Sequence, residues 1–335
     1  MIELPVVNQR GARRVPAPRQ RQPKPDWLRV RAPGGASYTL IKKTLRERGL
    51  YTVCEEAHCP NVGECWGGGT ATFMLLGGVC TRGCRFCAVS SGDPGGRVDA
   101  EEPRKLAESV AVLGLRYVVL TMVDRDDLPD GGAAHVASCV GALRDRAPQL
   151  IIEALVGDFQ GEESAIDVVC ESGLEVFGHN IETVERLQRV VRDSRCGYRR
   201  SLGVLEHAKA HRSVPYTKSS IMLGLGENET ELLQTLRDLR SVGVDFLTLG
   251  QYLQPTARHL PVREFVTPAQ FEHYRRLGEA EGFRTVASGP LVRSSYRAGE
   301  IFVESLVHAQ RGSAASTVQR RPTDQLGGEG CRTSC

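Results

Sequence analysis

Three cysteines lie within eight consecutive positions of the sequence, in the stretch GGVCTRGCRFC. They are Cys80, Cys84 and Cys87, and neither a histidine nor a fourth cysteine lies within ten residues of them. A structural zinc site has four protein ligands, and an ordinary iron–sulfur cluster also has four. The trio therefore predicts a metal centre in which one ligand position is left for something other than this chain.

A second trio of cysteines precedes the first, in the stretch YTVCEEAHCPNVGECW. Cys54, Cys59 and Cys65 are separated by four and by five residues, and again no fourth ligand is obvious. A disulfide framework is not expected in a long chain without a signal peptide, so these clustered cysteines point to metal in a reducing, cytoplasmic compartment. The remaining cysteines are expected to be buried or incidental thiols: Cys139, Cys170, Cys196, Cys331 and Cys335.

The composition is that of a globular protein. Of the 335 residues, 41% are hydrophobic and 25% are charged. No apolar run approaches the ~18–20 residues that a membrane span needs. Residues 1–33 hold eight basic and two acidic residues, a net charge of +6, so the rest of the chain, with 35 basic and 38 acidic residues, carries −3. A nearly neutral body argues against nucleic-acid binding, which normally needs a concentrated basic face.

Short β-rich runs alternate with helix-like stretches from residue 70 onward. Such alternation predicts a parallel sheet of the α/β class, and about six repeats predict an incomplete (β/α)6-type barrel. Active sites of such barrels lie at the C-terminal ends of the strands, and Cys80 closely follows the first predicted strand. The predicted strands are 72–77, 116–121, 150–156, 174–179, 219–224, 245–250 and 283–288, and the predicted helices include 37–48, 102–113, 161–172, 200–212 and 227–242.

The chain divides into five predicted segments. Residues 1–36, rich in proline and arginine, form a basic tail that is disordered or wraps on a neighbour; a mitochondrial transit peptide is the competing interpretation. Residues 37–69 form an extension that carries the second trio, and residues 70–290 form the barrel. Residues 291–310 are a C-terminal segment, and residues 311–335 lack periodicity and are predicted to be disordered.

The first trio, Cys80-x3-Cys84-x2-Cys87, resembles the signature of the radical S-adenosylmethionine (SAM) enzymes, and we refer to it as the radical trio. In that superfamily three thiolates hold a 4Fe–4S cluster and SAM chelates its fourth iron, which accounts for the missing ligand. Over about residues 25–300 the chain resembles the lipoyl synthase family, which is marked by the Cys-x4-Cys-x5-Cys spacing of the second trio. The other matching stretches are VDRDDLPDGGAAH, IEALVGDFQG, HNIETV, MLGLGE, LTLGQYLQPTARHLPV and ASGPLVRSSY.

The resemblance implies roles in cofactor binding for several residues. Phe86 is expected to pack near the adenine of SAM, and Gly224 and Glu227 belong to an element that lies beside the same ring. Asn180 is expected to point at the cofactor. Glu153, an acid inside a predicted strand, is expected either to hydrogen-bond the ribose of SAM or to close a structural salt bridge.

The resemblance also implies an auxiliary 4Fe–4S cluster on the second trio, Cys54, Cys59 and Cys65, which we call the auxiliary trio. In the family a serine of the Arg-Ser-Ser-Tyr motif, residues 293–296 here, is the fourth ligand. Ser295 is the expected ligand, and Ser294 is the alternative. A serine oxygen is a harder ligand than a thiolate and suits iron that must leave.

Three residues are expected to contact the substrate. Arg258 and His259 follow a predicted strand end, and Arg293 opens the Arg-Ser-Ser-Tyr motif. For His259 a surface role is the alternative interpretation.

The implied activity is that of a sulfurtransferase, which inserts two sulfur atoms at carbons 6 and 8 of an octanoyl chain on a carrier lysine. Two SAM molecules and the auxiliary cluster would be consumed. The implied partners are octanoylated lipoyl carrier domains (2-oxoacid dehydrogenase E2 subunits and the glycine cleavage H protein), an electron donor such as ferredoxin or flavodoxin, and an iron–sulfur carrier that rebuilds the auxiliary cluster. We expect a monomer without nucleic-acid or membrane partners.

Four alternatives stay open at the level of the sequence. The radical trio taken alone also fits a zinc site. The chain as a whole also fits another sulfur-inserting radical SAM enzyme, such as a biotin synthase relative, although that family lacks the auxiliary trio. A non-catalytic iron–sulfur scaffold is the third alternative. A catalytically silent or re-purposed paralogue is the fourth, suggested by Ser220, Gly178 and Ala257, where the family usually has other residues.

Overall fold

The computed structural model describes residues 23–30, 34–56, 59, 61–67 and 70–295. The predicted C-terminal tail, Tyr296 of the Arg-Ser-Ser-Tyr motif and residues 1–22 of the predicted basic tail lie outside the described residues. The division of the chain into five segments therefore stays a prediction.

One sheet of eight strands forms the centre of the molecule, in the order β1-β2-β5-β6-β7-β8-β9-β10. All neighbouring strands from β2 to β10 pair in parallel, and only β1 is antiparallel to its neighbour β2. Each predicted strand is confirmed, with shifted ends. The strands are β1 (Tyr51–Thr52), β2 (Thr70–Leu75), β5 (Tyr117–Met122), β6 (Ile151–Leu155), β7 (Val176–Gly178), β8 (Tyr216–Leu223), β9 (Phe246–Gln251) and β10 (Thr285–Gly289).

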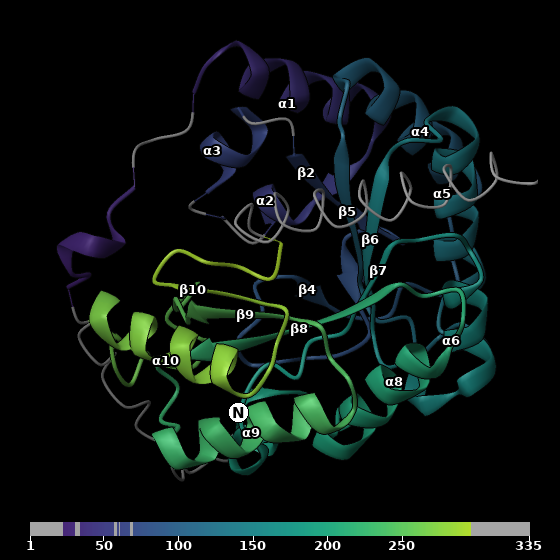
Figure 1. Cartoon of the computed structure of the whole chain (residues 1–335). Coiled ribbons are helices and arrows are strands. Elements are labelled where there is room, and N and C mark those ends of the chain that lie inside the picture. Colours follow the sequence, from purple (N-terminus) through teal and green to yellow (C-terminus); the bar gives the residue numbers. More distant parts are fainter. Residues whose placement is uncertain (1–22, 31–33, 57–58, 60, 68–69, 296–335) are drawn as a thin grey trace, which may run out of the picture.

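Six helical crossovers connect the seven parallel strands, which confirms the predicted partial (β/α)6 architecture. Within the described residues β10 pairs only with β9, so the sheet remains open at this edge. Figure 1 shows the crossover helices on the outer side of the curved sheet. They are α4 (Glu102–Leu113), α5 (Ala133–Arg146), α6 (Glu163–Cys170), α8 (Tyr198–Ala210), α9 (Glu229–Ser241) and α10 (Pro268–Ala280), and a short helix α7 (Gln188–Val191) precedes α8.

Local sequence signals fix several helix ends. Helix α9 begins with a capping box in which Asn228 and Glu231 satisfy each other's backbone N–H groups, and α10 begins with the same device from Thr267 and Gln270. Helix α4 ends at Gly114, whose φ of 60° is the left-handed conformation that glycine adopts without a steric penalty. These signals place the loops between strands and helices where the sequence pattern predicts them.

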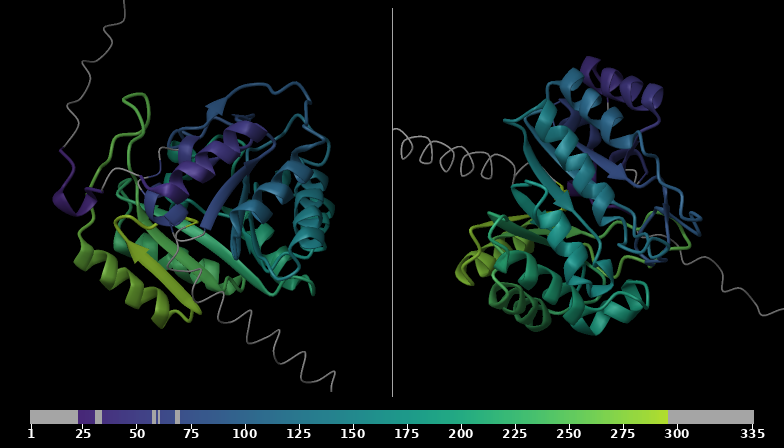
Figure 2. Two further views of the ribbon diagram at one scale, coloured as in Figure 1. Left: turned by 90° about the horizontal axis from the view of Figure 1, so that it is seen from above. Right: turned by 90° about the vertical axis from the view of Figure 1, so that its right-hand side faces the viewer.

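The N-terminal extension packs beside the first strands of the sheet. It contains α1 (Ala36–Arg48), α2 (Val53–Glu56) and α3 (Val62–Gly67), and Tyr38 stacks on the buried Trp66 with ring centroids 5.1 Å apart. Figure 2 shows these N-terminal helices gathered at one end of the sheet and α9 and α10 at the other. The extension thus holds the auxiliary trio at the β1–β2 edge of the sheet.

Apolar side chains pack the concave side of the sheet near the N-terminal ends of its strands. One buried cluster there consists of Tyr117, Val119, Ile151, Val176, Tyr216 and Phe246. Because this end is packed, the open space formed by the described residues lies toward the C-terminal ends. A partial barrel built in this way presents one mouth, and the loops that follow the strands line it.

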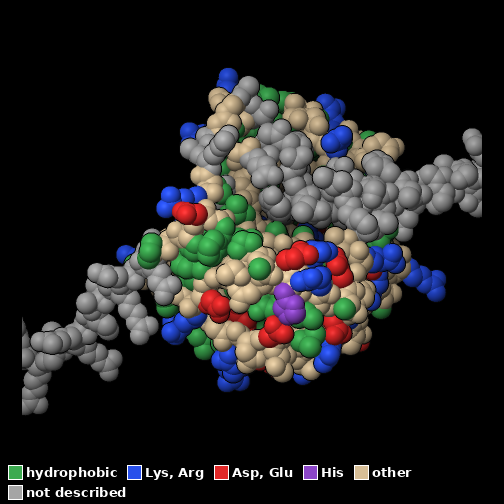
Figure 3. Space-filling model, turned by 60° about the vertical axis from the view of Figure 1, so that its left-hand side comes forward, with side chains coloured by type: hydrophobic (Ala, Val, Ile, Leu, Met, Phe, Trp, Pro, Cys, Tyr) green, Lys and Arg blue, Asp and Glu red, His purple; other side chains and the backbone are tan. Residues whose placement is uncertain are grey.

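Two features of the described residues bear on the sequence-based expectation of a nearly neutral body without membrane spans. No helix within the described residues combines the length and apolar character needed to cross a membrane. On the face drawn in Figure 3, acidic and basic side chains of the described residues are interspersed.

His179 at the end of β7 makes stability depend on pH. It is 2% exposed; its Nδ1 and Nε2 contact Val156 O and Ser201 Oγ, each at 2.9 Å, and burial together with nearby Arg192 lowers its pKa from 6.5 to about 4. The unfolded chain therefore binds this proton more readily than the folded chain. Stability should fall by about 3 kcal/mol as the pH drops from about 6.5 to about 4.

Urea unfolding of the metal-free protein at several pH values tests this prediction. His179→Gln should be less stable at pH 7 and should lose less stability on acidification. His273→Gln on α10, at a half-buried position beside Glu229, controls for the loss of one imidazole and should keep the wild-type slope. An unchanged slope in His179→Gln would contradict the assignment.

Candidate metal centre

A cavity of about 460 Å³ opens at the C-terminal ends of the strands. The radical trio lies on its wall, together with residues of β8 and loops that follow β5, β6, β7, β9 and β10. This placement agrees with the prediction that the first cysteine loop lies at the mouth of the barrel. The residues that line the cavity and enter the argument below are Cys80, Cys84, Cys87, Arg82, Phe86, Asp124, Asp158, Asn180, Glu182, Arg192, Cys196, Ser220, Gln251, Arg293 and Ser294.

Backbone N–H groups point at two of the three sulfurs of the radical trio. Arg82 N lies 3.4 Å from Cys80 Sγ, and Asp193 N lies 3.3 Å from Cys84 Sγ. Such hydrogen bonds stabilise a thiolate and tune the potential of an iron–sulfur cluster. Burial, with Asp124 nearby, raises the pKa of Cys80 to about 11, and burial also raises the pKa of Cys87. Metal binding here must therefore release protons from the thiols.

The spacing of the sulfurs fits a cluster of several irons better than a single ion. A tetrahedral zinc ion with Zn–S bonds of about 2.3 Å requires sulfurs about 3.8 Å apart. All six cysteines of the two trios belong to the described residues, yet neither trio brings three ligand atoms within 4.8 Å of one another. This geometry speaks against the zinc alternative. Three thiols on one cavity wall match a cluster whose remaining iron faces the cavity.

Arg82, inside the radical trio, is 3% exposed and joins three carboxylates. Its Nη2 lies 2.8 Å from Asp126 Oδ1 and 2.7 Å from Asp158 Oδ1, and its Nη1 lies 3.5 Å from Asp124 Oδ1. Asp124 and Asp126 follow β5, and Asp158 follows β6. One guanidinium therefore fixes the cysteine loop to the ends of two neighbouring strands.

Two of the residues predicted to bind the cofactor line the cavity. They are Phe86, on the cysteine loop, and Asn180, after β7. Asn180 Nδ2 donates to Glu182 Oε1 at 3.1 Å, and Glu182 also lines the cavity. Burial raises the pKa of Glu182. Sequence reasoning did not select Glu182, although it lies two residues beyond Asn180 in the same motif.

Gly224 and Glu227 follow β8 in the sequence and are not among the residues that line the cavity. Glu227 accepts a hydrogen bond from Leu225 N at 2.9 Å and another from Gly224 N, so its carboxylate holds the turn. A Cβ on Gly224 would lie 2.3 Å from Gln251 Nε2 and from Glu264 O. This glycine therefore allows two chain segments to approach closely. Of the nearby residues, Ser220 of β8 lines the cavity.

Glu153 does not reach the cavity. Both of its carboxylate oxygens lie 2.8 Å from Lys218 Nζ, and Tyr117 OH donates to Oε2 at 2.6 Å. Glu153 is fully buried and Lys218 is 6% exposed, near the packed N-terminal end of the sheet. Of the two roles expected for Glu153, this arrangement supports the structural salt bridge.

The auxiliary trio lies next to the C-terminal segment that carries the two candidate serines. Cys54 and Cys59 are close enough to interact electrostatically; burial, with Cys59 nearby, raises the pKa of Cys54 to about 12. Asn61 Nδ2 donates to Leu291 O at 2.6 Å, which joins the two segments. A Cβ on Gly250 would lie 2.1 Å from Val292 O, so β9 also holds the C-terminal segment closely.

Arg293 connects the two cysteine trios. It lines the cavity of the radical trio, and its positive charge also acts on Cys59 of the auxiliary trio. Burial lowers the pKa of Arg293. Ser294 lines the cavity, whereas the half-buried Ser295 is not among the residues that line it.

The two other residues predicted to contact substrate occupy different places. His259 Nε2 lies 2.8 Å from Cys87 O, so His259 contacts the backbone of the cysteine loop. Arg258 is exposed and does not line the cavity. The structure therefore brings His259, but not Arg258, to the radical trio.

Several residues that line the cavity were not predicted from the sequence to be functional. Arg82, Asp158, Arg192 and Cys196 line the cavity, and Arg82 Nη1 lies 3.5 Å from Cys196 Sγ. Arg82 lies between two cysteines of the radical trio, and Asp158 follows a predicted strand. Their position within the cysteine loop or after a strand is the signal that could have found these two. Arg192 and Cys196, between α7 and α8, carry no such signal.

Arg82→Ala should weaken both the fold and the metal centre. Removing one member of a buried ion pair costs about 4 kcal/mol, because the partner charges remain buried. The free energy of unfolding measured in urea and the iron content after anaerobic reconstitution should both fall. Arg82→Lys should lower both quantities less than Arg82→Ala does. It keeps the positive charge but loses the planar guanidinium, whose several N–H donors reach more than one carboxylate.

A surface arginine away from the cysteine loop provides the control for this prediction. Arg237 of α9 lies 3.2 Å from Glu281, and its side chain is 56% exposed. Arg237→Ala should therefore cost less than about 1 kcal/mol and leave the iron content unchanged. Equal losses in the Arg82 and Arg237 variants would contradict the role assigned to Arg82.

The chain matches two family models. Residues 74–239 match the radical SAM superfamily, and residues 8–59 match the N-terminal domain of lipoyl synthase of the radical SAM family. Two solved structures share the fold at low identity. Methylornithine synthase (PylB) gives a TM-score of 0.52 at 14% identity, covering 74% of this chain and 69% of its own. The [FeFe]-hydrogenase maturase HydG gives 0.53 at 12% identity, covering 75% and 63%.

Curated relatives are much closer in sequence. Lipoyl synthase of Ectopseudomonas mendocina is 58% identical, covering 84% of this chain and 80% of its own. Lipoyl synthase of Thermus thermophilus is 54% identical, covering 91% and 94%. A chloroplastic lipoyl synthase of Zea mays is 55% identical, covering 88% and 84%. With both cysteine trios present and this identity over most of its length, the chain belongs to the lipoyl synthase family of radical SAM enzymes.

Proposed function

We propose that this enzyme inserts two sulfur atoms, at carbons 6 and 8, into an octanoyl chain carried on a lysine of a lipoyl domain. The observation that carries the proposal is the position of Arg293. Arg293 lines the cavity of the radical trio, and its charge also lowers the pKa of Cys59 of the auxiliary trio, against the larger effect of burial. A radical generated at one trio would therefore arise close to sulfur held at the other.

Unactivated C–H bonds resist both bases and nucleophiles, so the reaction needs hydrogen-atom abstraction. When bound, the 4Fe–4S cluster and SAM supply the radical chemistry, while the protein supplies position and exclusion of water. The thiols of Cys80, Cys84 and Cys87 would hold three irons of that cluster. The cavity beside them offers space for SAM, with Phe86 and Asn180 on its wall.

We assign the auxiliary trio and Ser295 as the ligands of a second 4Fe–4S cluster, which serves as the sulfur substrate. The hydrogen bond from Asn61, between Cys59 and Cys65, to Leu291 O supports this assignment, because Leu291 lies four residues before Ser295. Ser294 is the alternative ligand, since its side chain lines the cavity. A hard serine oxygen would hold the departing iron more weakly than a thiolate does.

The partners follow from this chemistry. The substrate is an octanoylated carrier domain of a 2-oxoacid dehydrogenase or of the glycine cleavage system. An external one-electron donor, such as ferredoxin or flavodoxin, must reduce the radical cluster. A separate iron–sulfur carrier must rebuild the auxiliary cluster after each turnover, because its sulfide leaves with the product.

A single-turnover experiment tests the proposed function. The anaerobically reconstituted enzyme should hold about eight iron atoms per chain, for two clusters of four. With reductant, SAM and an octanoyl-lysine peptide it should form the dithiolated product once, as read by mass spectrometry. About four iron atoms, or deoxyadenosine without sulfur transfer, would contradict the assignment.

Two cysteine variants separate the roles of the trios. Cys59→Ala should still cleave SAM, because the radical trio is intact, but should transfer no sulfur. Cys84→Ala should do neither. If Cys59→Ala formed the dithiolated product, the auxiliary cluster could not be the sulfur source.

The serine ligand is tested in the same assay. Ser295→Ala should lower sulfur transfer by about tenfold, a loss typical of weakened metal sites. Ser294→Ala should change it by less than about twofold, since this side chain is not assigned as a ligand. The reverse pattern would assign Ser294 as the ligand.

A further inference from the structure

The chain turns sharply at Leu76, between β2 and the cysteine loop. Leu76 is 5% exposed and has a φ of 68°, which is the left-handed conformation that a leucine rarely adopts. Such backbone strain persists only where the surroundings over-determine it, and it clusters at functional sites. Cys80 follows only four residues later, so the direction of the chain at Leu76 affects where the radical trio begins.

The backbone N–H and C=O groups of Leu76 are both hydrogen-bonded to charged side chains. Leu76 N donates to Glu102 Oε2 at 2.9 Å, and Arg125 Nη1 donates to Leu76 O at 3.4 Å. Glu102 is 5% exposed and Arg125 is 1% exposed. Arg125 is itself fixed by Asp127, with N–O distances of 2.7 and 2.8 Å. These charged groups are therefore shielded from water, where their hydrogen bonds have the most effect.

The Leu76 side chain is held as well. A Cβ on Gly132 would lie 2.5 Å from Leu76 Cδ1, so only a glycine leaves room for this leucine. Gly132 N donates to Asp130 Oδ1 at 2.9 Å. Arg125, Asp127, Asp130 and Gly132 all belong to VDRDDLPDGGAAH, one of the stretches that carry the resemblance to the family.

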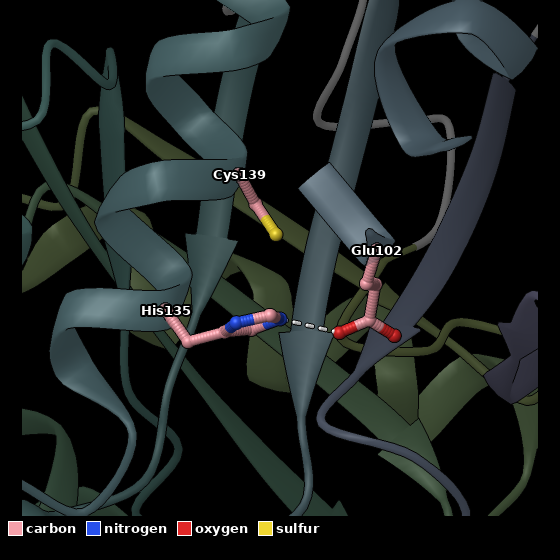
Figure 4. A group of neighbouring side chains, drawn as sticks. All are labelled: Glu102, His135 and Cys139. Atoms are coloured by element: carbon pink, nitrogen blue, oxygen red, sulfur yellow. Dashed lines mark hydrogen bonds and ion pairs between the residues drawn. The ribbon is translucent and has the colours of Figure 1, made fainter. Parts of the chain in front are cut away.

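His135 contacts the carboxylate of Glu102, as Figure 4 shows. Its Nε2 lies 2.6 Å from Glu102 Oε2, the same oxygen that accepts from Leu76 N. Since a carboxylate oxygen only accepts, Nε2 carries the proton in this contact. Glu102 begins α4 and His135 lies in the first turn of α5, so the pair also joins two helices to the turn.

Cys139, one helical turn beyond His135, raises the possibility of a metal ion. One ligand atom from each of Glu102, His135 and Cys139 lies within 4.8 Å of the other two. However, two ligands about 2.05 Å from one tetrahedral ion would be about 3.3 Å apart. The observed N–O separation of 2.6 Å is that of a hydrogen bond. The geometry thus favours a hydrogen-bonded pair over a metal site.

We propose that Glu102 and His135 are positioning residues. They hold the backbone turn at Leu76 in place and thereby orient the radical trio toward its cavity. Between this turn and Cys80 stand only Gly77, Gly78 and the exposed Val79. No atom lies within 4 Å of a Cβ placed on Gly77, so side-chain packing does not hold the loop at this residue. The buried anchor nearest to the trio on its N-terminal side is therefore the Leu76 turn. The inference rests on the proposed use of Cys80, Cys84 and Cys87 as cluster ligands.

The test uses the anaerobically reconstituted full chain and measures SAM cleavage and the effect of SAM on the electron paramagnetic resonance spectrum of the reduced cluster. Glu102→Ala and His135→Ala should lower deoxyadenosine formation per loaded cluster by about tenfold, as outer-shell changes at metal sites do. The SAM-induced spectral change should shrink in parallel. Glu102→Gln keeps an oxygen for Leu76 N and should stay within about twofold of the wild type.

A matched ion pair on the same helix distinguishes positioning from general stability. Arg144, in the last turn of α5, lies 2.8 Å from Glu175 at the opposite end of the sheet. Arg144→Ala should lower the unfolding temperature but leave both SAM readouts unchanged. Equal SAM readouts in wild type and Glu102→Ala, or an equal loss in Arg144→Ala, would overturn the proposal.

Cys139→Ala tests the metal interpretation directly. It should leave metal content and both SAM readouts unchanged, because the thiol takes no part in the hydrogen-bonded pair. Loss of about one zinc or iron per chain would replace the proposal with a metal site. None of these readouts needs sulfur transfer, so failure of the proposed sulfur insertion would not be confused with failure of the positioning pair.

Discussion

The buried guanidinium of Arg82 is the interaction on which the site depends. It lies inside the radical trio and contacts carboxylates that end two different strands. Without this positive charge, Asp124, Asp126 and Asp158 would face one another in a nearly water-free space, where like charges repel strongly. With it, the cysteine loop is attached to the sheet by charge-assisted hydrogen bonds, which are the strongest that side chains make. The metal site is thus built on a charge balance that exists before any iron binds.

The sheet determines where this balance can be built. Parallel strands bring their C-terminal ends together, so residues that follow β5, β6 and β7 meet although they are far apart in sequence. Aromatic and branched side chains fill the other end of the concave side. The ion pair of Glu153 and Lys218 also lies there, away from solvent and from the cavity. The cavity at the mouth is therefore open because the opposite end is packed.

The sequence allowed the strands, the crossover helices and the position of the cysteine loop to be predicted, because they depend on local patterns. Phe86 and Asn180 line the cavity, as residues on loops at the mouth of the barrel can, and their contact with the cofactor stays a prediction. Arg82 was not predicted, because its partners lie 44 and 76 residues away along the chain. Glu153 and Glu227 illustrate the same limit. Their carboxylates bind a lysine and backbone N–H groups that only the folded chain brings near, so their residue type alone does not distinguish a structural role from cofactor binding.

The surroundings of Arg293 give a physical reason to expect the auxiliary cluster. Burial lowers the pKa of this arginine, which means that its charge has lost hydration without full compensation. Among the described residues its side-chain donors contact carbonyl oxygens only, at 3.4 Å from Gln251 O and 2.7 Å from Val292 O. A cluster held by the thiolates of the auxiliary trio would bring negative charge to Cys59, whose thiol the charge of Arg293 already influences. The same cation that is poorly compensated without iron would then be paired, and iron binding at the auxiliary trio would tighten the C-terminal segment that carries Ser294 and Ser295.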